Sequence, residues 1–131
     1  FPQLNIYPVK GYSVTFNVDE SLLPKVSLLD EEAKIVTSSF NGRFRVAGTA
    51  ELAGWDQSIQ DERTFPLVRW TYNNTRIKTS VYEEWACLRP MTPNMMPAVQ
   101  YCERMIVNSG AGHLGWTLSM VLAKRAADLV L

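Results

Sequence analysis

The sequence predicts an α+β fold, in which a mostly antiparallel sheet carries a short helix and a long C-terminal helix. Alternating runs of β-branched and aromatic residues dominate its first half, and Asn41-Gly42 joins two of them, a strong hairpin signal. From Leu114 onward the apolar residues recur at helical spacing instead. No strand–turn–helix–strand unit for a dinucleotide is complete, because the chain ends with the last helix. The length favours one domain over residues 1–131.

The first half of the chain predicts three strands. Residues 6–18 form one strand with a bend or bulge at Gly11, and residues 20–30 form a loop. Residues 33–40 and 43–49 form the two strands of the hairpin. The side chains expected to share the apolar faces of these strands are Tyr12, Val14, Phe16, Val18, Phe44, Val46 and Gly48.

The second half predicts two helices and two strands. Residues 61–72 form a short helix with Pro66 in its first turn, and residues 78–88 form a strand. Prolines 90, 93 and 97 make a stiff connector that cannot be a central strand, and residues 104–108 form a short strand. Residues 114–131 form the long helix. The side chains expected to pack in the core are Val81, Tyr82, Trp85, Trp116, Leu118, Val121, Leu122, Ala126, Leu129 and Val130.

Charge and composition exclude several classes of protein. The 131 residues contain 13 basic and 13 acidic side chains, so the net charge is zero, which argues against binding to nucleic acid. No apolar run reaches the length of a membrane span. Cys87, Cys102 and His113 lack metal-ligand spacing, so we expect no metal site and two thiols in a reducing compartment. The chain is expected in the cytoplasm, with a peripheral position at the inner membrane as the alternative.

Arg89 is the first candidate binding residue. It follows an apolar run and precedes Pro90, so we expect its guanidinium to be only partly hydrated. A guanidinium binds a carboxylate through two parallel hydrogen bonds and stays charged at any physiological pH. The alternative is a structural arginine paired with Glu83 or Glu84.

The glycine-rich turn at residues 109–115 is the second candidate. Backbone N–H groups at the start of a helix attract anionic or electron-rich ligand atoms, and glycines let such a ligand come close. The alternative is a helix start that needs small residues for packing. His113 could cap the helix, titrate or face solvent, and no partner for a catalytic role is evident.

Four segments, in this order, resemble a known family. They are Pro-Val-Lys-Gly-Tyr-Ser at 8–13, Arg-Val-Ala-Gly-Thr-Ala-Glu-Leu-Ala-Gly at 45–54, Leu-Arg-Pro-Met-Thr-Pro at 88–93, and Asn-Ser-Gly-Ala-Gly-His-Leu-Gly-Trp-Thr at 108–117. Together they resemble the C-terminal part of FAD-dependent D-amino acid dehydrogenases, in the D-amino acid oxidase and glycine oxidase superfamily. Where that family favours Asp-Gly after Thr-Pro, this chain has Asn94-Met95.

The resemblance implies a substrate-binding domain that covers a flavin, with the dinucleotide-binding half supplied by the rest of the enzyme or a partner subunit. Arg89 would bind the substrate α-carboxylate, with no side chain needed as a catalytic base. The residues implied to contact FAD are Ser109, Gly110, Gly112, Leu114 and Gly115.

The implied activity is oxidation of a D-amino acid by hydride transfer to FAD, with hydrolysis of the imine to a 2-oxo acid and ammonia, and an electron acceptor such as a quinone. FAD is expected to bind weakly or not at all to this chain alone. Two alternatives are a non-catalytic or degenerate binding module of this fold, and a glycine, sarcosine or hydroxyproline oxidase of the same superfamily.

Overall fold

The computed structural model describes residues 4–102 and 104–130, and these residues form two units. The sheet unit comprises Lys10–Glu51 and Asp56–Cys87, and the hairpin unit comprises residues 4–9, Leu52–Trp55 and the described part of 88–130. The strands are β1 (Tyr7–Asn17), β2 (Leu29–Asp30), β3 (Ile35–Phe40), β4 (Arg43–Glu51), β5 (Tyr82–Met91), β6 (Ala98–Cys102) and β7 (Met105–Ser109). The α-helices are α1 (Asp61–Asn74) and α2 (Gly115–Ala127), and short 3₁₀ turns cover Glu20–Leu22 and Gly112–Leu114. The α+β class with a mostly antiparallel sheet is confirmed.

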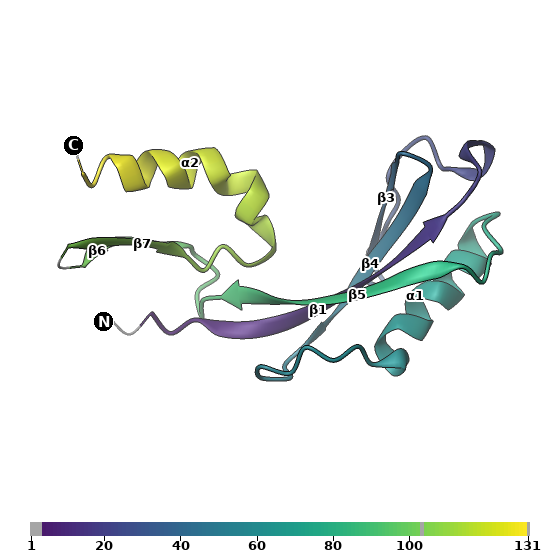
Figure 1. Cartoon of the computed structure of the whole chain (residues 1–131), viewed down its shortest axis with the longest axis horizontal. Helices are drawn as coiled ribbons and strands as arrows, with labels where there is room; N and C mark the ends of the chain where they lie inside the picture. The colour runs from purple at the N-terminus through teal and green to yellow at the C-terminus, as the bar shows by residue number, and fades with distance from the viewer. Residues whose placement is uncertain (1–3, 103, 131) are drawn as a thin grey trace. The chain divides into compact units, whose positions relative to one another are not determined.

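The hairpin predicted around Asn41-Gly42 is confirmed as β3 and β4 (Figure 1). The sheet order is β2-β3-β4-β1-β5, and β4 pairs antiparallel with both β3 and β1. The β3–β4 turn places Asn41 and Gly42 at φ of 46° and 72°, the left-handed conformations that a two-residue hairpin turn requires. The register between β1 and β4 shifts between Gly11 and Tyr12, which confirms the bulge predicted there.

The core of the sheet unit lies between the sheet and α1. Period-2 alternation turns the large apolar residues of the strands to this one face, as predicted. The buried core side chains are Tyr12, Val14, Phe16, Ile35, Phe44, Val46, Leu67, Val68 and Ile77. Gly48 of β4 allows close packing here, since a Cβ at this position would lie 2.9 Å from Cδ2 of Leu67 and 3.2 Å from Cγ1 of Ile35.

Three sequence predictions for the sheet unit were wrong. The loop at 20–30 contains a 3₁₀ turn, capped by the Asp19 carboxylate, and the short strand β2. Pro66 lies inside α1 rather than in its first turn, because the helix already begins at Asp61. Pro66 is exposed there, so water can satisfy the backbone carbonyl that a proline leaves without a donor.

For β5, the packing predicted for Tyr82 is confirmed, and the packing predicted for Val81 and Trp85 was wrong. Val81 and Trp85 are 65% and 50% exposed, whereas Tyr82 packs on Phe16 with ring centroids 5.4 Å apart. A shift of one residue moves every side chain of a strand to the other face.

Pro90, predicted in a connector, belongs to β5, and an edge strand tolerates it because one side of its backbone needs no hydrogen-bonded partner.

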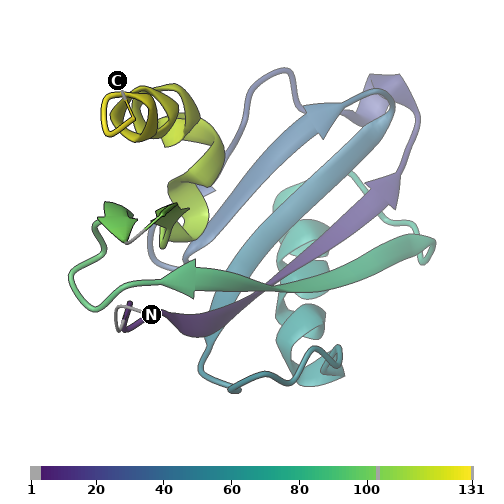
Figure 2. The same cartoon turned by 60° about the vertical axis from the view of Figure 1, so that its left-hand side comes forward.

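The hairpin unit consists of the antiparallel pair β6–β7 with α2 beside it (Figure 2). The strand predicted at 104–108 is β7, whereas β6 was missed inside the proline-rich segment. The helix predicted at 114–131 is confirmed as α2, and Leu131 lies outside the described residues. Its apolar stripe is not a core: of the helix residues only Leu122 is buried, and Trp116 is 93% exposed. The prediction that residues 1–131 form a single substrate-binding domain stays a prediction.

A buried cation holds the two ends of the β4–α1 connection in the sheet unit. The fully buried Lys10 ammonium donates hydrogen bonds to Asp56 Oδ2 at 2.9 Å and to the backbone oxygen of Ser58 at 3.0 Å. It lies 3.3 Å from Glu51 Oε2, which also accepts a 2.5 Å hydrogen bond from the Tyr12 hydroxyl. Two acids from opposite ends of one loop therefore share one ammonium group.

These contacts shift the pKa values of the cluster. Burial alone would lower the pKa of Lys10, but its hydrogen bonds to Asp56, Tyr12 and Glu51 outweigh burial and raise it. The hydrogen bonds from Ser58 and Lys10 lower the pKa of Asp56 from 3.8 to about 2. The Lys10–Asp56 contact is consequently charged at every physiological pH.

Gly48→Val is expected to lower the free energy of unfolding by about 1–3 kcal/mol, because the added methyl groups overpack the contact between β4 and Leu67. Urea unfolding of the chain measures the change. Ala50→Val, at an exposed position of the same strand, is the matched control and should change stability much less. Equal effects of the two substitutions would contradict the close packing at Gly48.

Asp56 makes stability depend on pH in acid. Its pKa is lowered on folding, so its contribution is complete above pH 4 and is lost as the pH falls toward 2. The difference in unfolding free energy between the wild type and Asp56→Asn should therefore be largest at pH 5 and smaller at pH 3, as measured by urea unfolding. The exposed Glu31→Gln is the control. A difference for Asp56→Asn that does not change with pH would refute the ionic role.

Candidate functional site

Arg89 lines a small apolar cavity in the hairpin unit. The cavity has a volume of about 220 Å³ and is bounded by Ile6, Pro8, Trp55, Leu88, Arg89 and Pro90. Arg89 is half-buried, near the end of β5. An arginine beside apolar side chains can bind an anion more strongly than an arginine surrounded by water.

Within the part of the chain that the structure describes, the Arg89 side chain makes no ion pair and no side-chain hydrogen bond. The structural alternative expected Glu83 or Glu84 as the partner of Arg89. The Glu83 carboxylate lies 3.9 Å from Arg43 Nη1 instead, and Glu84 forms no ion pair with Arg89 in the described chain. The described chain therefore leaves the donors of Arg89 available to a ligand.

The end of β5 lies beside the glycine-rich turn. Met91 pairs with Ala111 in an isolated antiparallel bridge, and a Cβ at Gly112 would lie 2.3 Å from the Met91 sulfur. Arg89 and Met91 are two residues apart on one strand, so their side chains leave the same face of β5. The structure thus brings Arg89 and the turn to one face of one unit, while their roles in binding stay predictions.

The three glycines of the turn differ in how closely other atoms surround them. Gly110 is buried at φ +81°, and a Cβ there would meet Thr92 Cγ2 at 2.6 Å. Gly112, at φ +55°, is covered by Met91. Gly115 is exposed, and a Cβ there would meet nothing nearer than the Ala111 Cβ at 3.8 Å. Internal packing explains the first two, whereas the backbone at Gly115 is open to a ligand.

The helix start after this turn carries no side-chain cap. Ala111 and Leu114, which precede the 3₁₀ turn and α2, both lack a capping side-chain hydrogen bond. The first N–H groups of a helix have no partner within the helix, and they carry partial positive charge. Ser109 is half-buried at the end of β7, whereas Leu114 and His113 are exposed.

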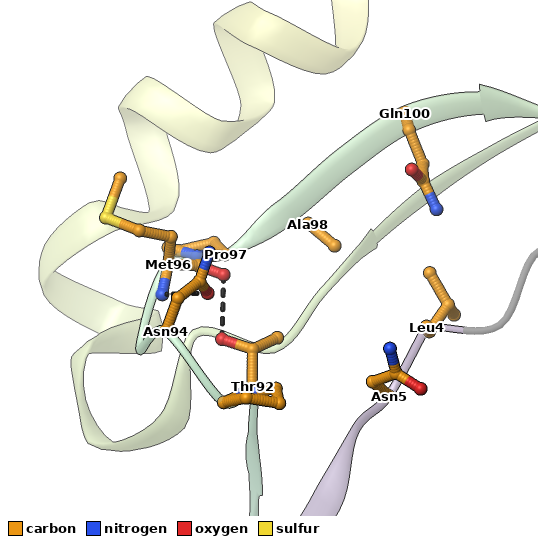
Figure 3. A pocket seen from close by; sticks show the side chains of 9 residues that line it. Leu4, Asn5, Thr92, Asn94, Met96, Pro97, Ala98 and Gln100 are labelled. Atoms are coloured by element: carbon orange, nitrogen blue, oxygen red, sulfur yellow. Dashed lines mark hydrogen bonds between the residues drawn. The ribbon is translucent and has the colours of Figure 1, made fainter.

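A second, more polar cavity borders the Thr-Pro loop (Figure 3). Its volume is about 390 Å³, and Leu4, Asn5, Asn94 and Gln100 are among the residues around it. The loop is held by a hydrogen bond from the buried Thr92 hydroxyl to the backbone oxygen of Met96, 2.8 Å long. Of the residues that the structure describes, none with a charged side chain lines this cavity.

Met95, next to Asn94 in this loop, adopts φ +58°. The resemblance expects a glycine here, and the left-handed conformation explains that preference, since other L-residues reach it only at a cost.

Reasoning from the sequence missed the other walls of the Arg89 cavity. Ile6, Pro8 and Trp55 lie far from Arg89 in the chain, and only the folded chain brings them together. The segments 8–13 and 45–54, which carry the resemblance, include Pro8 and end one residue before Trp55. The resemblance assigned no role to Ile6, Pro8 or Trp55.

The remaining expectations concern metals, thiols and membranes. Across the described residues no cluster of His, Cys, Asp and Glu could hold a metal ion. Cys87 and Cys102 are half-buried and form no disulfide. In the same part of the chain, no helix has the length and apolar character needed to cross a bilayer.

Two curated relatives are similar along almost the whole chain. The D-amino acid dehydrogenase 3 of Mesorhizobium japonicum is 47% identical over 136 residues, which cover 98% of this chain and 33% of that protein. The D-amino acid dehydrogenase of Chromohalobacter salexigens is 41% identical over 134 residues, which cover 98% of this chain and 32% of that protein. The chain therefore spans about a third of the length of these relatives.

The fold has close matches among solved structures. Glycine oxidase from Geobacillus kaustophilus superposes with a TM-score of 0.78 at 21% identity, over 98% of this chain and 36% of that one. L-proline dehydrogenase from P. horikoshii gives 0.77 at 17% identity, over the same shares of the two chains. The model of the family "FAD dependent oxidoreductase" (DAO) matches residues 1–129. The chain belongs to this family of FAD-dependent oxidoreductases.

Proposed function

We propose that this chain is the substrate-binding part of a flavin-dependent D-amino acid dehydrogenase, which converts D-amino acids to 2-oxo acids and ammonia. The observation that carries the proposal is Arg89, which lines an apolar cavity of about 220 Å³ and has no acid partner in the described chain. The names of the two curated relatives supply the substrate class.

The task of Arg89 is to bind and orient the α-carboxylate. Two parallel hydrogen bonds fix both the position and the plane of a carboxylate, which a single point charge does not. The substituents on Cα then have a defined direction. Orientation of this kind contributes to catalysis because the reacting C–H bond is held toward one acceptor instead of rotating freely.

The apolar walls around Arg89 exclude water from the bound carboxylate. A guanidinium–carboxylate pair gains more in such a site than in bulk solvent, because the lower dielectric strengthens the attraction. Pro8 and Pro90 stiffen two of these walls, since proline restricts the backbone. Among the described residues that line this cavity, none carries a side chain suited to act as a general base.

FAD, when bound, supplies the two-electron acceptor of the reaction. The chain's own contribution would come from Ser109, Gly110, Gly112, Leu114 and Gly115. The uncapped helix start and the open backbone at Gly115 fit this role, because they present N–H groups to an electron-rich edge and leave room for its approach. Gly110 and Gly112 would act indirectly by allowing the turn to pack on Thr92 and Met91.

Arg89→Lys, in the flavoenzyme proposed to contain this chain, should raise KM for D-amino acids about 10- to 100-fold, because lysine cannot form the paired contact. Steady-state kinetics with a dye as electron acceptor measures the change. Arg125→Lys, at an exposed position of α2, is the matched control and should leave KM within about twofold. An unchanged KM in Arg89→Lys would remove Arg89 from the site.

The isolated 131-residue chain should bind FAD weakly or not at all, because it offers one helix start and lacks a complete dinucleotide-binding unit. A titration that follows flavin fluorescence tests this, with the complete flavoenzyme as positive control. Quenching that saturates at micromolar chain would show that these residues are sufficient to bind the cofactor.

A further inference from the structure

The walls of the Arg89 cavity determine which substrate side chains it accepts. Apart from Arg89, the described residues around it are apolar: Ile6, Pro8, Trp55, Leu88 and Pro90. A carboxylate bound to Arg89 would bring the rest of a small amino acid against these walls. A charged side chain would lose its hydration there without gaining a partner, and a cationic one would also be repelled by Arg89.

Trp55 differs from the other walls. Its side chain is 80% exposed although it borders the cavity, so its indole has a large apolar surface available to a ligand. A single exposed apolar residue needs no functional explanation, and Leu52 in the same loop is 78% exposed without bordering the cavity. The position beside Arg89 is what distinguishes Trp55.

The loop that carries Trp55 is short and fixed at its two ends. Residues 52–55 connect Glu51 to Asp56, and both of these acids contact the Lys10 ammonium, at 3.3 Å and 2.9 Å. Gly54 provides the turn just before Trp55 with a φ of +59°. A loop of this length with both ends held has few backbone conformations.

We infer that Trp55 selects the substrate side chain and that the preferred substrates are D-amino acids with apolar side chains. The inference rests on the proposed function, because it places the substrate carboxylate on Arg89. The indole contacts the substrate beyond Cα, where the apolar area it covers increases with the size of the substrate side chain. A cavity of about 220 Å³ is smaller than typical drug-sized pockets and suits a ligand of this size.

The test compares kcat/KM for D-phenylalanine, D-leucine, D-alanine and D-lysine in the complete flavoenzyme. The wild type should favour D-leucine over D-lysine by at least about tenfold. Trp55→Ala should lower the ratio of kcat/KM for D-phenylalanine to that for D-alanine by roughly 10- to 100-fold, and Trp55→Phe should retain most of the ratio. Leu52→Ala is the matched control in the same loop and should not change the ratio.

The outcomes separate this inference from the proposed function. An unchanged ratio in Trp55→Ala, or an equal fall in Leu52→Ala, would overturn the role of Trp55 while leaving the dehydrogenase intact. A wild type that oxidises none of the four D-amino acids would overturn the proposed function and the inference with it. Thermal unfolding of each variant verifies that it is folded, which the exposure of Trp55 leads us to expect.

Discussion

Arg89 has no acid to pair with in the described chain, and it lines a cavity whose other described walls are apolar. A half-buried charge without a partner costs free energy in the unliganded protein. The same feature makes the site selective, because an anion that enters the cavity supplies the missing partner. Lys10 shows the opposite solution: it is more deeply buried, and Asp56, Glu51 and the Ser58 backbone oxygen satisfy it completely. Lys10 is paired within the fold, whereas Arg89 has no acid partner in the described chain.

The surroundings of Arg89 follow from simple backbone constraints. Pro90 is acceptable in β5 because this strand is at the edge of the sheet. Two residues after Arg89, Met91 pairs with Ala111 and so ties the strand to the glycine-rich turn. The turn can approach only because Gly110 and Gly112 lack side chains that would collide with Thr92 and Met91. Arg89 and the uncapped helix start therefore belong to one unit.

Local patterns in the sequence predicted the features that depend on near neighbours. Asn41-Gly42 indicated the hairpin, alternation indicated β1 and β4, and Gly11 indicated the bulge. The errors arose where a distant contact decides. Trp85 is packed or exposed depending on which face of β5 points to the core of the sheet unit. The sequence did not indicate β6, because this strand follows a proline-rich segment and is defined by its pairing with β7. Arg89 and the turn could be named as candidates, whereas Trp55 became visible only through the folded cavity.

The central claim is that Arg89 binds the carboxylate of the substrate. A crystal structure of the complete flavoenzyme with a bound 2-oxo acid product tests it most directly. The expected result is a two-pronged contact, with two guanidinium nitrogens at about 2.7–2.9 Å from the two carboxylate oxygens. A structure in which Arg89 is paired with an acid from elsewhere in the enzyme, while another residue binds the product carboxylate, would contradict the claim.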